Sequence, residues 1–256
     1  MTLLDGLVLG IIEGITEFLP ISSTGHLILA GKLLGIPDSD FYKTFEIAIQ
    51  LGAILSVVVL YWRSFLDLEI VKRLVVAFIP TGIIGLLLHG VAKKYLLGNE
   101  FVVLGALFLG GIVLIVFERF YRHGDETVQS VHAITYKQAA FMGFFQSLAI
   151  VPGVSRSAAT IVGGLLTSGM SRITIVEFSF LLAVPTMFAA TGLDVIKSAS
   201  LFSNVNLGIL SVGFITSFLV ALFGIKFLLD YVRKNSFTAF GIYRIVIALL
   251  FFLFLL

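Results

Sequence analysis

Two carboxylates, a run of hydroxyls and a histidine lie close together near the start of the chain. Glu13 and Glu17 are four residues apart, so on a helix both carboxylates share one face. Pro20 then interrupts the helix, because proline lacks an N–H and disfavours helix at the preceding residue. The following turn adds three hydroxyls and an imidazole, on Ser22, Ser23, Thr24 and His26. Capping of a following helix explains one or two serines, whereas acid–base and nucleophilic catalysis explains the whole set.

A second polar segment, centred on Arg156, lies in the other half of the chain. Ser155, Arg156 and Ser157 follow Pro152 and Gly153. Arginine is planar and permanently charged, which suits bidentate contacts with phosphate. The N–H groups that open the following helix favour the same kind of ligand. Snorkelling to the membrane surface is the alternative for this arginine. Combined with the first segment, the residues form the set that phosphoryl transfer needs.

Other polar residues are predicted to support this set rather than to react. Glu46 and Gln50 share one helix face, and Glu177 repeats Glu46 in the second half. Gln146 either hydrogen-bonds across the site or makes an ordinary helix contact. The remaining charges within apolar segments are interpreted as ion pairs or snorkelling groups: Asp194, Lys226 and Arg244. The sequence contains no phosphate-binding GxxxxGK[ST] loop, no HExxH and no dinucleotide glycine motif.

The composition indicates a membrane protein. Of 256 residues, 59% are hydrophobic and only 12% are charged, with a mean hydropathy of +1.10. Soluble domains carry about 25% charged residues, so the apolar excess must face lipid. The net charge of +2, with no dense basic run, argues against a nucleic-acid partner. The absence of cysteine excludes disulfides and thiolate metal sites.

Two kinds of apolar segment alternate along the chain. Six are long enough to span a bilayer, at 44–62, 74–92, 101–118, 174–196, 207–229 and 239–256. Within 1–35 and 138–170, shorter apolar stretches are broken by Pro, Gly and Ser, which is typical of re-entrant segments. We therefore predict an all-α integral membrane protein. It has six transmembrane helices plus two re-entrant helical hairpins in a single membrane domain, 1–256.

The two halves, 1–130 and 131–256, are similar in pattern. EFLPISSTGH (17–26) corresponds to AIVPGVSRSAAT (149–160), and each hairpin is followed by three spans. Since three crossings reverse the side of entry, the halves form an inverted-topology repeat, whose site is expected where the hairpins meet. The loops between the spans fall into two sets on opposite sides of the membrane, with eight Lys and Arg residues in the first set and five in the second. Because cytoplasmic loops carry more Lys and Arg, the first set is expected in the cytoplasm and both termini outside. The first set is 63–73, 119–137 and 230–238, and the second is 30–43, 93–100 and 197–206.

Several motifs together resemble a known family. EGITEFLPISSTGH (13–26) and PGVSRSAAT (152–160) are the most specific, and KTFEIAIQLGAI (43–54), EFSFLLAVP (177–185) and IYR (242–244) extend the match. On these residues the sequence resembles the undecaprenyl-diphosphate phosphatase, or bacitracin-resistance, family. The resemblance implies hydrolysis of a polyprenyl diphosphate lipid to the monophosphate and inorganic phosphate, which recycles the lipid carrier of cell-wall synthesis. It also implies a multi-pass protein of the cell (inner) membrane, with a site open toward the outer face.

The resemblance further assigns roles to individual residues. It makes five residues catalytic, namely Glu13, Glu17, Ser23, His26 and Arg156. The neighbouring hydroxyls are expected to contact phosphate, on Ser22, Thr24, Ser155 and Ser157. Ser23 is the preferred nucleophile with His26 as proton carrier, although His26 can itself be the nucleophile. Two bare carboxylates repel a diphosphate, so Glu13 and Glu17 need a metal, a proton or the arginine nearby, and a divalent cation, Mg²⁺ or Ca²⁺, is the expected solution. Activation of Ser23 or of a water is the alternative role for these carboxylates.

Two other classes of protein compete with the phosphatase. A polyprenyl-phosphate transporter or flippase can use the same broken hairpins, and it would bind without cleaving. A purely structural membrane subunit leaves the buried charges unexplained. The expected partners are the lipid substrate and the surrounding membrane lipid, with no nucleic acid. The oligomeric state, a homodimer included, is left open.

Overall fold

The computed structural model describes residues 1–96, 99–121, 126–167, 169–197 and 206–255, and within these ranges it is helical with no β-strand. Five of its helices are long and apolar enough to cross a membrane: α3 (Asp40–Leu60), α5 (Leu68–Tyr95), α6 (Glu100–Phe120), α9 (Arg172–Lys197) and α10 (Leu207–Val232). They confirm a multi-pass, all-α membrane protein. The predicted sixth span coincides with α11 (Thr238–Leu255), whose apolar stretch is shorter, and residue 256 lies outside the described part.

The two broken regions each form a pair of short helices separated by a turn. The first pair is α1 (Leu3–Thr16) and α2 (Ser23–Leu33), and the second is α7 (Tyr136–Gln146) and α8 (Arg156–Leu166), preceded by the 3₁₀ turn η2 (Ser147–Ile150). Helices of 11–14 residues are too short to cross a bilayer core of roughly 30 Å. The pairs are called hairpin 1 (α1–α2) and hairpin 2 (α7–α8) below.

Local sequence sets the ends of the hairpin helices. Thr2 and Thr135 each close a capping box at the start of α1 and α7. Pro20 and Pro152 fall in the turns, where no helical N–H is needed. Ser22 and Ser155 then cap α2 and α8 through their side chains. Each hairpin therefore breaks where the sequence pattern predicted it.

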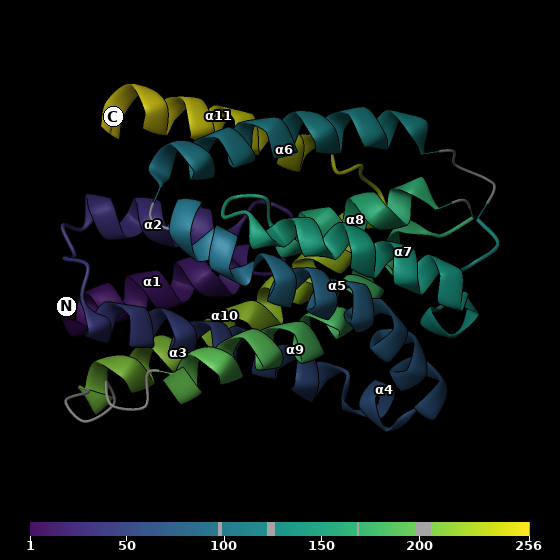
Figure 1. The fold of residues 1–256 in the computed structure, drawn as a ribbon, viewed down its shortest axis with the longest axis horizontal. Coiled ribbons are helices and arrows are strands. Elements are labelled where there is room, and N and C mark those ends of the chain that lie inside the picture. Colours follow the sequence, from purple (N-terminus) through teal and green to yellow (C-terminus); the bar gives the residue numbers. More distant parts are fainter. Residues whose placement is uncertain (97–98, 122–125, 168, 198–205, 256) are drawn as a thin grey trace.

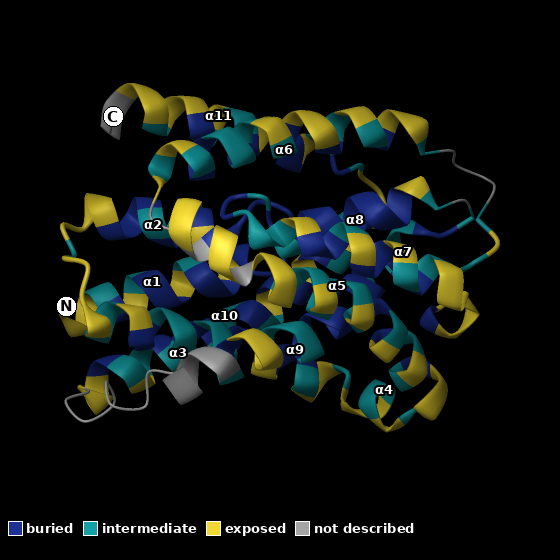
Figure 2. Ribbon diagram, in the orientation of Figure 1, coloured by how far each residue is buried: buried dark blue, intermediate teal, exposed yellow. Residues whose placement is uncertain are grey.

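The remaining helices hold the hairpins in place. α1 packs against α10, which packs against α3, while α7 packs against α5 and α3 contacts α9. α6 and α11 lie together along one edge of the molecule (Figure 1). The turn of hairpin 1 is buried near the centre, and the turn of hairpin 2 is buried in part (Figure 2). Phe18 of the first turn is fully buried and meets Phe180 of α9 edge to face, with centroids 5.3 Å apart.

A buried ion pair joins three helices away from the hairpin turns. Arg172, which opens α9, donates its Nε–H to Glu118 Oε1 on α6 at 2.9 Å. The other carboxylate oxygen accepts the main-chain N–H of Phe237, just before α11, at 3.3 Å. The guanidinium also lies over the Tyr121 ring, 4.4 Å from its centroid. Because each charge has several partners, we interpret this cluster as structural.

Candidate active site

A chain of three polar side chains connects the two hairpins. Ser23, the first residue of α2, donates its hydroxyl to Glu17 Oε2 at 2.5 Å. The other oxygen of Glu17 accepts from Arg156 Nη2, the first residue of α8, at 3.1 Å. All three side chains are buried or nearly so. A hydroxyl, a carboxylate and a guanidinium from residues far apart in sequence are thus joined by two hydrogen bonds, as the sequence pattern predicted.

Both broken helices begin with the same unusual backbone. Ser22 has φ 74° and Ser155 has φ 73°, and among the described non-glycine residues only these two have a positive φ. Such conformations cost about 1–3 kcal/mol and cluster at functional sites. Each hydroxyl accepts the N–H three residues on, from Gly25 at 3.3 Å and from Ala158 at 3.2 Å. These two serines, predicted to contact phosphate, therefore use their hydroxyls as helix caps in this structure.

A cavity of about 720 Å³ opens at the tips of the hairpins. Its polar end is lined by Glu17, Ser22, Ser23, Thr24, Ser155 and Arg156. The rest runs between α5 and α9 and is mostly apolar, with Phe78, Leu86 and Phe188 among its walls. Thr24 is exposed in it, which leaves its hydroxyl available to a ligand. A polar pocket that continues into an apolar groove suits an amphiphile with an anionic head.

The structure does not bring His26 to this cavity. Its Nδ1 lies 2.7 Å from the main-chain oxygen of Ser22 and its Nε2 lies 2.8 Å from the hydroxyl of Tyr243 on α11. A carbonyl oxygen can only accept, so Nδ1 carries the hydrogen and, in the neutral ring, Nε2 accepts from the tyrosine. The two rings are nearly parallel, at 4°. Both ring nitrogens of His26 are thus occupied by groups other than Ser23.

Glu13 lies one helical turn before Glu17 and is fully buried. Neither of its carboxylate oxygens has a hydrogen-bond partner among the described residues, and it is not part of the cavity lining. A buried carboxylate without partners is costly, so a proton or a cation belongs there. Hard cations prefer such oxygen ligands, and Mg²⁺ usually binds one or two carboxylates plus substrate phosphate and water. The oxygens of Glu13 and Glu17 suit Mg²⁺ better than Ca²⁺, which takes about six to eight oxygen ligands, and no cluster of three acidic or imidazole ligands occurs in the described ranges.

The other predicted residues lie around the site in different ways. Ser157 donates to the main-chain oxygen of Phe18 at 2.8 Å, which ties hairpin 2 to the turn of hairpin 1, and it does not line the cavity. Gln50 lines the cavity from α3. Glu46 and Glu177 are partly buried on α3 and α9, and neither is brought to the lining.

Gln146 both lines the cavity and braces four helices. Its amide nitrogen donates to Thr81 of α5 at 3.2 Å and to Thr186 of α9 at 2.9 Å. Its amide oxygen accepts from Thr160 of α8 at 3.2 Å. These three bonds hold the side chain in a fixed position, with α7 as its own helix. Gln146 is thus both a contact between helices and part of the cavity wall.

The expectation that Arg244 forms an ion pair or snorkels to the surface is wrong. It is fully buried, and its guanidinium donates to five main-chain oxygens. The sequence signal that could have found it is an arginine well inside an apolar helix, which by itself suggests function. Lys226 is exposed, and the side chain of Asp194 lies outside the described part.

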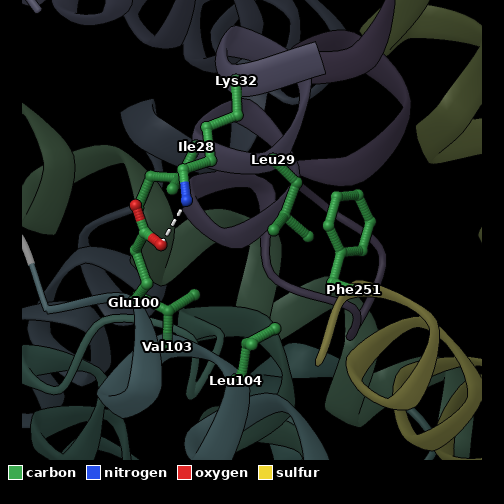
Figure 3. A pocket seen from close by; sticks show the side chains of 7 residues that line it. All are labelled: Ile28, Leu29, Lys32, Glu100, Val103, Leu104 and Phe251. Carbon is green, nitrogen blue, oxygen red and sulfur yellow. Dashed lines mark hydrogen bonds and ion pairs between the residues drawn. The ribbon is translucent and has the colours of Figure 1, made fainter. Parts of the chain in front are cut away.

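A second hollow is too small to bind a substrate. It lies between α2, α6 and α11, encloses about 10 Å³, and is bordered by the Lys32–Glu100 ion pair (Figure 3). That volume holds about one water molecule. Of these two cavities, only the one at the hairpin tips can receive a head group.

The sequence matches a known family over most of its length. The chain belongs to the family described as bacitracin resistance protein BacA, whose model matches residues 6–250. It is 51% identical to an undecaprenyl-diphosphatase of Sulfurihydrogenibium sp., over 99% of both chains. It is 53% identical to an undecaprenyl-diphosphatase of Aquifex aeolicus, over 99% of this chain and all of the relative. A third, from Persephonella marina, is 49% identical over the full length of both.

Proposed function

We propose that this protein hydrolyses undecaprenyl diphosphate to undecaprenyl phosphate and inorganic phosphate. The observation that carries the proposal is the Ser23–Glu17–Arg156 line at the polar end of a cavity whose remainder is apolar. Full-length relatives named undecaprenyl-diphosphatase support hydrolysis over transport. In cell-wall synthesis this reaction recycles the lipid carrier, and it underlies bacitracin resistance in the sense of the family's name.

Arg156 is placed to hold the diphosphate. Nη1 is fixed by the main-chain oxygen of Ser179 at 3.0 Å and Nη2 by Glu17. The side chain lines the cavity, and its guanidinium carries further N–H groups beyond the two that make these bonds. A guanidinium held in place at the cavity wall is suited to bind phosphate oxygens. The N-termini of α2 and α8, which start at the cavity, add N–H groups that favour an anion.

Ser23 then acts as the nucleophile and Glu17 as its general base. The hydroxyl of Ser23 already donates to Glu17, so the proton moves to that carboxylate as Oγ attacks the terminal phosphorus. The bond from phosphorus to the bridging oxygen breaks, and undecaprenyl phosphate leaves with that oxygen. The proton on Glu17 passes to the leaving phosphate. Arg156 offsets the charge that develops during this exchange.

Water completes the cycle by hydrolysing the phosphoserine. Glu17, again a carboxylate, accepts a proton from water as the water oxygen attacks phosphorus. The bond from phosphorus to Ser23 Oγ breaks, Oγ regains the proton, and inorganic phosphate is released. One carboxylate serves both half-reactions because it stands beside the serine oxygen throughout.

Glu13 would hold a divalent cation, with Glu17 beside it. When bound, such a cation neutralises phosphate charge and polarises the bond to the leaving group. The unpartnered oxygens of Glu13 support this assignment. We expect phosphate release to fall on chelation and to recover with added Mg²⁺ or Ca²⁺. Glu13→Gln should raise the cation concentration that gives half-maximal rate, and an unchanged cation dependence would argue for a proton at Glu13 instead.

We also propose the membrane arrangement that the sequence pattern indicates. The groove between α5 and α9 leaves the prenyl chain among apolar side chains while the head group reaches the hairpin tips. The two hairpins enter from opposite faces as halves of an inverted repeat, 1–130 and 131–256, and the site opens to the outer face of the inner membrane. The matching cap serines of α2 and α8 support the repeat. Cysteine labelling from either side of sealed vesicles tests this topology.

Phosphate release by the purified protein tests the function directly. Wild type in detergent, with undecaprenyl diphosphate and Mg²⁺, is expected to release inorganic phosphate without a gradient or a partner protein. Geranylgeranyl diphosphate, with the same head group and a shorter tail, is the matched substrate control. Lipid movement between leaflets without phosphate release would support the transporter instead.

A further inference from the structure

The fully buried Arg244 of α11 contacts both hairpin turns at once. Its Nη1 donates to the main-chain oxygen of Pro20 at 3.2 Å and to that of Val154 at 2.9 Å. Its Nη2 donates to the oxygen of Gly153 at 2.9 Å. One guanidinium therefore joins the turn that precedes Ser23 to the turn that precedes Arg156. In the described part of the chain, every recorded partner of Arg244 is a carbonyl oxygen and none is a carboxylate.

The same side chain is anchored to α6. Nη2 donates to the oxygen of Ala106 at 3.0 Å and Nε to the oxygen of Leu107 at 3.3 Å. Broken backbone at membrane depth must find its hydrogen bonds within the protein, because lipid supplies none. Arg244 provides such hydrogen bonds for both turns, and its contacts with Ala106 and Leu107 fix the two turns to α6. Five donors in a rigid plane make arginine suited to this task, whereas lysine offers three donors on a flexible stem.

A glycine on α6 makes room for this arrangement. A methyl group on Gly110 would lie 2.1 Å from Nη2 of Arg244 and 2.8 Å from its Cζ. Any side chain at 110 would displace the guanidinium. Gly105 lies on the same helix, and a methyl group there meets nothing within 4 Å. The chain thus offers one substitution that disturbs Arg244 and a matched one that does not.

We propose that Arg244 is a positioning residue for the reaction, acting through the backbone of the two turns to set Ser23 against Arg156. It does not line the cavity. The expected effect on kcat rests on the proposed phosphatase function, whereas the effect on the arrangement of the hairpins does not. A misplacement of about 1 Å between reacting groups can cost about 100-fold in rate. Loss of the Arg244 contacts should therefore lower kcat more than it raises KM.

The test compares Gly110→Ala with Gly105→Ala, and adds Arg244→Lys. All three are assayed for kcat and KM of phosphate release and for thermal unfolding in detergent. Since the chain has no cysteine, spin labels on Ile15→Cys and Leu148→Cys report the distance between the hairpins cleanly. Both positions are exposed and lie outside the cavity lining.

We expect Gly110→Ala to lower kcat by about 30-fold and Arg244→Lys by about 10-fold, with KM within about 3-fold of wild type. The distance distribution between the labels should broaden in both, and Gly105→Ala should match wild type in every measurement. A folded Gly110→Ala with wild-type kcat and an unchanged distance distribution overturns the proposal. If Gly110→Ala does not fold, Arg244→Lys decides in its place, since it adds no atoms to the core.

Failure of the proposed function gives a different result. If wild type releases no phosphate, the phosphatase assignment fails, but the label distances and unfolding midpoints still report whether Arg244 positions the hairpins. A loss of kcat in Gly110→Ala without any change in distance overturns the positioning role while leaving the phosphatase intact. Arg172→Lys, in the separate ion-pair cluster, is the control for general loss of stability, and its kcat should stay near wild type.

Discussion

The two hairpins share a backbone and differ in chemistry. In both, a serine with φ near 73° caps a short helix, and its hydroxyl oxygen accepts a hydrogen bond from the N–H three residues on. The next residue, the first of the helix, is Ser23 in hairpin 1 and Arg156 in hairpin 2. Two turns of the same conformation thus present different groups: hairpin 1 presents a hydroxyl and hairpin 2 a permanent cation.

This difference explains how a nearly symmetric framework produces an asymmetric site. Phosphoryl transfer needs a nucleophile and a charge that stabilises the transferred group, and two identical hairpins would supply only one kind. The acidic partner, Glu17, comes from hairpin 1 alone, and it bonds to both of the presented residues. Hairpin 1 therefore carries the reacting groups, and hairpin 2 carries the anion-binding group.

The largest effect is expected from removing the group that hairpin 1 presents. Ser23→Ala should lower kcat by at least about 1,000-fold, because the nucleophile is lost and only binding remains. Ser157→Ala is the matched control on hairpin 2. It loses the bond to Phe18 and about 1 kcal/mol of stability, with kcat within a few-fold of wild type. If Ser23→Ala retains a tenth of the wild-type rate, the nucleophile is His26 or water rather than Ser23.

The second largest effect is expected from the group that hairpin 2 presents. Arg156→Ala should cost at least about 100-fold in phosphate release, and Arg156→Lys should recover little, because lysine cannot bond to Ser179, Glu17 and phosphate in one plane. Steady-state kinetics in detergent measures both variants. Equal rates for wild type and Arg156→Ala would mean that hairpin 2 does not bind the head group.

A smaller difference separates the two candidate proton carriers of hairpin 1. Glu17→Gln should lower kcat about 100-fold, whereas His26→Gln should lower it about 10-fold, because the imidazole is engaged by Ser22 and Tyr243. Tyr243→Phe, which removes one of those partners, should cost less still. The same kinetic assay ranks the three variants. The reverse order for Glu17 and His26 would show that the imidazole turns toward the cavity during the reaction.

The smallest effects should come from the two cap serines, Ser22 and Ser155. They should change the stability of the protein, by equal amounts in the two hairpins. Ser22→Gly and Ser155→Gly relieve a positive φ and lose a cap that glycine partly replaces, so each should stabilise the protein by about 0.5–1 kcal/mol. Ser→Ala at the same positions keeps the strain and should destabilise by about 1 kcal/mol. Thermal unfolding in detergent measures all four. Unequal shifts would mean that the two turns are not equivalent.

The sequence predicted the helices and the breaks between them better than the contacts of their side chains. Apolar length located the spans, and proline with hydroxyls located both breaks, because these features act locally. The meeting of Glu17 with Arg156 followed from the repeat pattern. The capping use of Ser22 and Ser155 and the distance of His26 from the cavity depend on backbone angles and helix rotation, which residue spacing does not specify. Arg244 was misinterpreted because its partners are carbonyl oxygens, which every residue has and no motif records.

The carbonyl oxygens around Arg244 resemble the oxygen shells that proteins elsewhere build for Ca²⁺ or K⁺. Those ions exchange with the medium, and their occupancy follows the ionic composition. Here the cation is tethered to α11, so it cannot be diluted, competed away or stripped by a chelator. The framework that holds the hairpins is therefore independent of dissolved salts.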